Sequence, residues 1–122
     1  MAILDKGDKV LVVYRRMYAS DMPHYFVGTV EDFAEGLAAV SGYSWEKEQF
    51  AGQMNMIEGI RTKIVPIASG TVLAYLLPRE VEIERLVFET LGRDKLWLTD
   101  RARFRMNIAE RTSPTGGAAF ED

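Results

Sequence analysis

Hydrophobic residues occur along this chain in short runs, many of which alternate with polar residues, and Gly, Pro, Ser and Asp separate the runs. Alternation with a period of two residues between such boundaries is typical of β-strands. The pattern predicts five core strands, at residues 10–14, 26–31, 37–43, 63–68 and 71–77. We therefore expect an all-β domain.

The clearest single unit is a hairpin formed by residues 26–40. Phe26, Gly28 and Val30 fall on one side of a strand, and Glu35 with Gly36 supplies the turn before the return strand. Gly36 suits a positive φ in that turn. A glycine in the middle of a strand, as at Gly28, indicates a bend or a close approach of two backbones.

We predict a β-meander in the last third of the chain, because hydrophobic residues alternate with other residues in three successive segments. The first segment contains Leu86 and Phe88, and the second contains Leu96 and Leu98. The third segment contains Phe104, Met106 and Ile108, and a turn is expected at residues 92–94. Residues 1–110 are predicted to form one domain. Residues 111–122 have turn formers and almost nothing to bury, which predicts a disordered tail.

Three segments between these strands are harder to assign. Residues 15–23 predict a loop, and we expect the only histidine, His24, to be solvated beside it. Residues 46–59 predict a long, partly ordered excursion, in which Met54, Met56 and Ile57 either pack on their own domain or offer an apolar patch to a partner. Residues 79–84 predict a turn that leads to a strand at Arg85.

Composition narrows the class of protein. The chain has 122 residues, no cysteine and a net charge of −3. This length supports a core without disulfides or metal, and an acidic chain has no general attraction for nucleic acid. The N-terminus lacks the pattern of a signal peptide, and acidic residues interrupt any membrane span. We expect a cytoplasmic protein with no membrane partner.

Residues that could support catalysis are scarce. With one histidine and no cysteine, a hydrolase would depend on His24, and no serine lies in a nucleophile-elbow context. Neither a phosphate-binding loop nor a dinucleotide fingerprint occurs. Glu31, Asp32 and Glu35 cluster at the hairpin tip, but a solvated acidic turn is favoured over a metal site. We predict no enzyme activity, no cofactor and no metal.

The one patterned basic feature is Arg101, Arg103 and Arg105, which alternation places on one face of the final strand. Such a face either binds phosphates, with a base stacking on Trp97 or Tyr75, or keeps a sheet edge in solvent. Nucleic acid is therefore one possible partner.

Two motifs together resemble the Sm-like family of small five-stranded β-barrels, which includes RNA chaperones. Phe26, Gly28, Val30, Phe33 and Leu37 are similar to the hydrophobic-x-Gly-x-hydrophobic-x-x-Phe pattern of that family. The second motif comprises Gly70, Tyr75, Leu76 and Pro78, and residues 6–12 are similar to the first strand of the family. The resemblance covers residues 6–78 and implies an SH3-like or Sm-like barrel, to which the C-terminal meander is added.

The resemblance also implies an assembly, because neighbouring Sm-like subunits pair their fourth and fifth strands into a ring. The corresponding interface candidates here are Ile64, Ile67, Val72, Leu73 and Leu76. The Asp, Asn and Arg that contact RNA in the family are replaced by Ala34, Ala38 and Ser69. We therefore expect a non-catalytic homo-oligomeric assembly or interaction module, with binding of RNA or single-stranded nucleic acid as the alternative.

Overall fold

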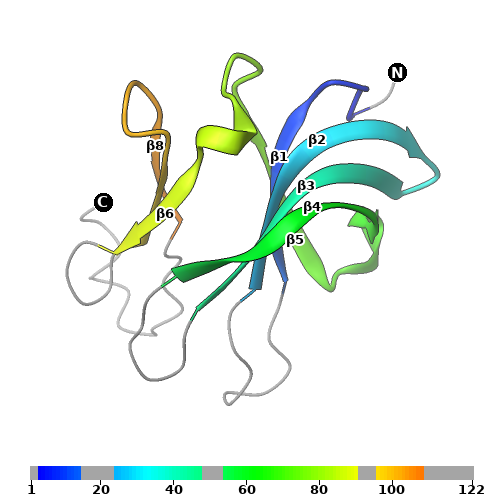
Figure 1. The fold of residues 1–122 in the computed structure, drawn as a ribbon. Helices are drawn as coiled ribbons and strands as arrows, with labels where there is room; N and C mark the ends of the chain where they lie inside the picture. Colours follow the sequence, from blue (N-terminus) through cyan, green and yellow to red (C-terminus); the bar gives the residue numbers. More distant parts are fainter. Residues whose placement is uncertain (1–2, 15–23, 48–53, 91–95, 109–122) are drawn as a thin grey trace, which may run out of the picture. The chain divides into compact units, whose positions relative to one another are not determined.

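The fold was analysed in a computed structural model, which describes residues 3–14, 24–47, 54–90 and 96–108 (Figure 1). In chain order the elements are β1 Lys9–Tyr14, β2 His24–Ala34, β3 Leu37–Lys47, β4 Met54–Pro66, η1 Ile67–Ser69, β5 Val72–Leu77, η2 Ile83–Arg85, β6 Val87–Thr90, β7 Leu96–Thr99 and β8 Arg105–Asn107. The two η elements are single turns of 3₁₀-helix. The prediction of an all-β protein is confirmed. No helix among the described residues has the length and apolar composition required to span a membrane.

The chain divides into two compact units, Met1–Leu86 and Val87–Asp122. The first unit contains a five-stranded antiparallel sheet in the order β4-β3-β2-β1-β5. All five predicted core strands are present. The predicted closed barrel is not seen, because β4 and β5 lie at opposite edges of the sheet and no ladder joins them in the described residues. Sequence periodicity predicts strands, whereas closure depends on how the two edge strands meet.

Strands β2 and β3 bend along their length, as Figure 1 shows. Gly28 and Gly42 lie directly opposite each other in this pair. A Cβ atom on Gly28 would lie 2.5 Å from the carbonyl oxygen of Ser41, and one on Gly42 would lie 1.9 Å from that of Val27. Both distances are too short for any other residue type. The expected close backbone approach at Gly28 is therefore confirmed, and Gly42 shares it.

The hairpin turn between β2 and β3 consists of Glu35 and Gly36, as predicted. Their φ values are 54° and 79°, so both residues adopt left-handed conformations, and Ala34 pairs with Leu37 across the turn. Two consecutive positive φ values are the signature of the type I′ turn that joins tightly paired antiparallel strands. The turn fixes the register of the strands that carry Phe26 and Val40.

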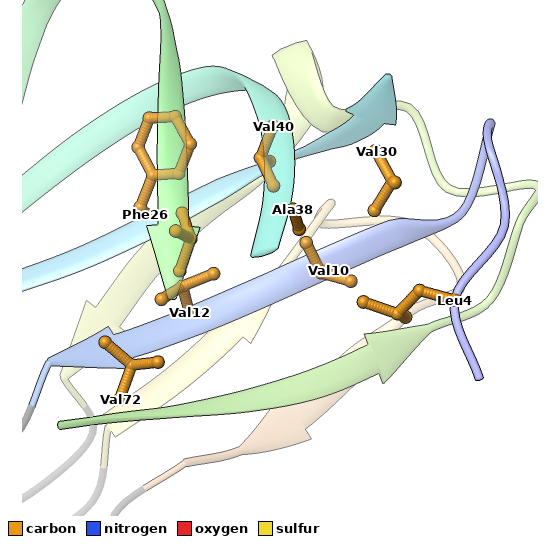
Figure 2. Packing of buried hydrophobic residues seen from close by; sticks show 9 residues of the cluster. Leu4, Val10, Val12, Phe26, Val30, Ala38, Val40 and Val72 are labelled. Atoms are coloured by element: carbon orange, nitrogen blue, oxygen red, sulfur yellow. The ribbon is translucent and has the colours of Figure 1, made fainter. Parts of the chain in front are cut away.

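One hydrophobic cluster of the first unit, called the core below, lies on one side of the sheet, while Leu11 and Val27 are fully buried on the opposite side. Its buried residues come from the N-terminal loop and all five strands; they are Leu4, Val10, Val12, Phe26, Val30, Ala38, Val40, Val65 and Val72. Figure 2 shows Val10 and Val12 projecting from β1 to the side on which Phe26 and Val40 also lie. Val65 of β4 and Val72 of β5 belong to the same cluster although their strands are at opposite edges. The sheet is therefore strongly curled around this core.

An ion pair and hydrogen bonds connect the segment that follows β5 to the N-terminal region of the chain. Arg79 forms an ion pair with the buried carboxylate of Asp8, and the Lys9 ammonium donates hydrogen bonds to the carbonyl oxygens of Arg79 and Val81. Asp8 also accepts a hydrogen bond from the backbone N–H of Asp5. These contacts connect the two ends of the first unit beside its core.

The second unit contains a three-stranded antiparallel sheet in the order β6-β7-β8. Phe88 and Leu98 pair across β6 and β7 and are both buried, and Leu98 pairs with Met106 of β8. The predicted meander is confirmed for the described residues.

Several predicted boundaries are wrong. His24 begins β2 instead of standing outside a strand, β3 continues to Lys47, and β4 begins at Met54, so strands occupy most of the predicted excursion. Backbone pairing with Glu46 outweighs the weak strand propensity of Asn55. Gly59, which has a φ of 96°, lies in the irregular part of β4 between the paired residues Ile57 and Arg61. At the other end, β4 stops at Pro66 and η1 follows, while η2 delays the predicted strand at Arg85 until β6. The predicted loop, turn and tail at residues 15–23, 92–94 and 111–122 lie outside the described residues.

Candidate functional site

The two edges of the first sheet are the most exposed apolar elements of that unit. In the described part of the chain, β4 pairs only with β3, and β5 pairs only with β1. An edge strand presents backbone N–H and C=O groups along the side that has no partner. We call these two sides the free edges of β4 and β5.

Large apolar side chains accompany both free edges. Ile60 and Ile64 of β4 are 63% and 66% exposed, and Leu73 and Leu76 of β5 are 47% and 62% exposed. Leu37, which pairs with Pro66 at the end of β4, is also exposed. Apolar groups in such positions typically mark a surface that another chain covers.

The interface candidates from the sequence divide into two groups. Ile64, Leu73 and Leu76 are exposed at the free edges. Val72 is buried in the hydrophobic core, and Ile67 is half-buried against that core. The first three offer exposed side chains to a second molecule without rearrangement of the fold.

A basic pair lies on the core-facing side of β4. Lys63 pairs with Val40, a core residue, and Arg61 pairs with Gly42 two positions along β3. Directly opposed residues of an antiparallel pair point to the same face, so both cations lie on the side of the sheet that carries the core. Sequence analysis missed this pair, because Arg61 was assigned to no strand.

The Lys63 side chain on β4 extends to two aromatic rings on other strands of the sheet, those of Phe26 on β2 and Tyr14 on β1. Its Nζ atom lies 4.7 Å from the centroid of the Phe26 ring and 5.4 Å from that of Tyr14. Both distances are typical of cation–π contacts. Burial lowers the pKa of Lys63, and the positive charge of Arg61 lowers it further. Burial raises the pKa of the Tyr14 phenol.

The prediction that Arg101, Arg103 and Arg105 share one face of the final strand is wrong. Arg101 has a φ of 62° and lies in the bend before β8, as does Arg103, so only Arg105 belongs to the strand. Arg101 is paired with Glu89, while the guanidinium carbon of Arg105 lies 4.7 Å from the centroid of the Trp97 ring. Asp100 accepts backbone hydrogen bonds from Phe104 and Ala102 in this bend, and these bonds lower its pKa.

The structure brings Arg105 and Trp97 together. Tyr75 lies in the first unit, on β5, where it pairs with Leu11 of β1. Its strand neighbours place it on the face opposite the core, since Val10 and Val12 flank Leu11 in β1.

The acidic and histidine candidates have ordinary structural surroundings. The Asp32 carboxylate accepts a hydrogen bond from the backbone N–H of Phe33, and the Nε2 atom of His24 lies 3.5 Å from the Oε2 atom of its cross-strand neighbour Glu46. Among the described residues, no three His, Cys, Asp or Glu side chains are grouped closely enough to hold a metal ion.

Comparisons with protein-family models, with curated proteins and with solved structures found no match for this chain. The similarity to the Sm-like family therefore consists of the quoted sequence motifs. The structure shows an antiparallel all-β protein with two sheets in the described residues.

Proposed function

We propose that this chain is a non-catalytic interaction module whose copies assemble when the free edge of β4 in one subunit pairs with the free edge of β5 in the next. The observation that carries this proposal is the placement of β4 and β5 at opposite edges of one sheet. Each subunit thereby offers two different edges, and a head-to-tail contact uses both.

The side chains at these edges support the proposal. Addition of a strand supplies backbone hydrogen bonds, and apolar side chains beside the strand bury area against the partner. Ile64 on β4, with Leu73 and Leu76 on β5, lies in position to do so. Pro66 ends β4 and has no N–H, which limits the paired length on that side.

The Sm-like resemblance supports the same arrangement. It implies a five-stranded barrel with subunits joined through the fourth and fifth strands, and here those strands are the two with free edges. The curl that brings Val65 and Val72 into one core also fits a barrel-like shape. Replacement of the RNA-contacting residues by Ala34, Ala38 and Ser69 favours assembly over RNA binding as the main role.

Light scattering after size exclusion, at micromolar concentration, tests the proposal. A discrete multiple of the 13.8 kDa chain mass is expected. Ile64→Lys and Leu73→Lys should each shift the protein to the monomer, because a charge on an edge strand opposes pairing. Ile3→Lys is the matched control, since Ile3 is 87% exposed and lies outside both edge strands. A monomeric wild type, or a multimer that neither edge variant affects, contradicts the proposal.

Binding of single-stranded nucleic acid is a second candidate function. The observation that favours it is Arg105 over the Trp97 ring, because arginine and aromatic groups together bind phosphates and bases. Titration with short oligonucleotides at low salt tests it. Salt-sensitive binding that Arg105→Gln weakens and Arg85→Gln does not would support this function, and an absence of binding would reject it.

A further inference from the structure

Arg61 and Lys63 form a concentrated positive charge on the first unit. They are two positions apart on one face of β4, a spacing of about 7 Å along the strand. Arg79, Arg85 and Arg101 each pair with a carboxylate, but neither Arg61 nor Lys63 has a carboxylate within ion-pair distance in the described residues. Two neighbouring cations without a counter-charge attract an anion.

A buried hydroxyl group lies beside the same aromatic ring. Ser44 is 5% exposed and pairs directly with Phe26, whose ring contacts the Lys63 ammonium. The Ser44 Oγ atom has no hydrogen-bond partner among the described residues. A buried polar group without a protein partner is unusual in a native protein, and a bound ligand can supply that partner. The pairing with β2 places Ser44 on the same face as Gly42, the partner of Arg61, although the register between β3 and β4 shifts between these two positions.

We propose that Arg61, Lys63 and Ser44 form a binding site for a phosphate group on the core-facing side of β3 and β4. Arg61 supplies the planar donor pair that matches a phosphate, and Lys63 supplies a second cation. The Ser44 hydroxyl provides a further donor when Lys63 moves off the Phe26 ring toward the ligand. This site is independent of the proposed assembly, because strand pairing uses backbone groups in the plane of the sheet while these side chains point out of it.

Phosphate can reach this site as a free ion or mononucleotide, or as part of a nucleic-acid strand. The chemistry at Arg61 and Lys63 is the same for each source. Titration with inorganic phosphate, uridine monophosphate and short oligothymidylate separates them. Similar affinities for all three indicate a small phosphate ligand, whereas stronger and more salt-dependent binding of oligothymidylate indicates a strand.

The proposal is tested on the full chain by NMR. The ¹³Cε resonance of Lys63 should titrate at higher pH in saturating phosphate than in chloride at equal ionic strength, because a bound anion favours the charged ammonium. Arg61→Gln and Lys63→Met should each weaken binding about tenfold or more, which corresponds to the loss of one charge-assisted hydrogen bond. Met is chosen because its side chain keeps an apolar stem over Phe26.

Lys6→Met is the matched control, since it removes one exposed lysine charge from the same unit. Saturable binding that Lys6→Met preserves and the two site variants lose supports the proposal. Ser44→Ala should weaken binding without a change in the Lys63–Phe26 contact. The proposal is overturned if none of the three probes binds saturably, or if binding persists unchanged in both Arg61→Gln and Lys63→Met.

Discussion

Asp8 and Arg79 are 71 positions apart in the sequence, yet an Arg79 Nη2 atom lies 2.8 Å from an Asp8 Oδ1 atom. Asp8 precedes β1, and Arg79 follows β5, the strand that pairs with β1. The ion pair therefore closes the first unit at the point where its first and last strands meet.

We predict that Asp8→Asn lowers the free energy of unfolding by about 1–2 kcal/mol at neutral pH, since the hydrogen bonds of Asp8 are to a backbone N–H and to an exposed arginine. The pKa of Asp8 is lowered first by the Asp5 N–H and then by Arg79. A lowered pKa in the folded state stabilises the fold above the ordinary carboxyl value, about 3.9, and this contribution disappears as the pH falls below it. Urea unfolding at several pH values measures both effects. A constant difference between wild type and variant down to low pH would contradict this assignment.

We predict that Gly42→Ala is strongly destabilising, by about 3 kcal/mol or more, because its Cβ would collide with the backbone of Val27 and Gly28. Gly70→Ala is the matched control. Gly70 has a φ of 84°, but no atom lies within 4 Å of the position that an alanine methyl group would take, so only backbone strain of about 1–2 kcal/mol is expected. Chemical unfolding of both variants separates collision from strain. Equal losses in the free energy of unfolding would show that β2 and β3 can separate around Gly42.

We predict that Lys63→Met leaves stability unchanged at neutral pH or raises it slightly, because it removes a partly desolvated charge beside Arg61 whose repulsion is screened by solvent. The pKa of Lys63 is lowered in the folded state, so the unfolded chain binds more protons and wild-type stability should rise with pH until about 10.4. The raised pKa of Tyr14 acts in the opposite direction above about 10. The difference between wild type and variant isolates Lys63, and should shrink as the pH rises through the folded-state pKa. A difference that is independent of pH would count against a desolvated ammonium at this position.

We predict that Thr99→Val lowers the free energy of unfolding by about 1–3 kcal/mol despite its matched shape. The buried Thr99 hydroxyl donates to the carbonyl oxygen of Phe104 and accepts from the backbone N–H of Arg101. Valine leaves both backbone groups without this partner. Thr29→Val on β2 is the control, and hydrogen exchange at the Arg101 amide reports on the local effect. Unchanged exchange there would show that the hydroxyl does not hold the bend.

Local sequence patterns predicted the strands well where turn chemistry and hydrophobic alternation agree. Glu35 and Gly36 specify their turn through backbone preference alone, and Gly28 marks the close approach because no larger residue fits. Both features are set within a few residues of the chain, so sequence alone was sufficient.

Features that depend on distant partners were less predictable. His24 extends β2 because it pairs with Glu46 of β3, and Lys47 extends β3 because it pairs with Met54 of β4. Neither residue signals this pairing locally. The alternation of Arg101, Arg103 and Arg105 suggested a common face, but the positive φ at Arg101 and its pairing with Glu89 break that pattern. The Lys63 site was missed because it requires the curl that brings β4 toward Tyr14.

The strand order β4-β3-β2-β1-β5 also determines how this unit can fold. Strands β2 and β3 are joined by a two-residue turn and can pair within microseconds, whereas β5 must return from nearly the whole length of the unit to reach β1. Until β5 arrives, one side of β1 lacks a partner, and a second chain can supply its own β5 to the same position. At high concentration, slow docking of β5 therefore makes exchange of this strand between copies the natural misfolding route of the unit.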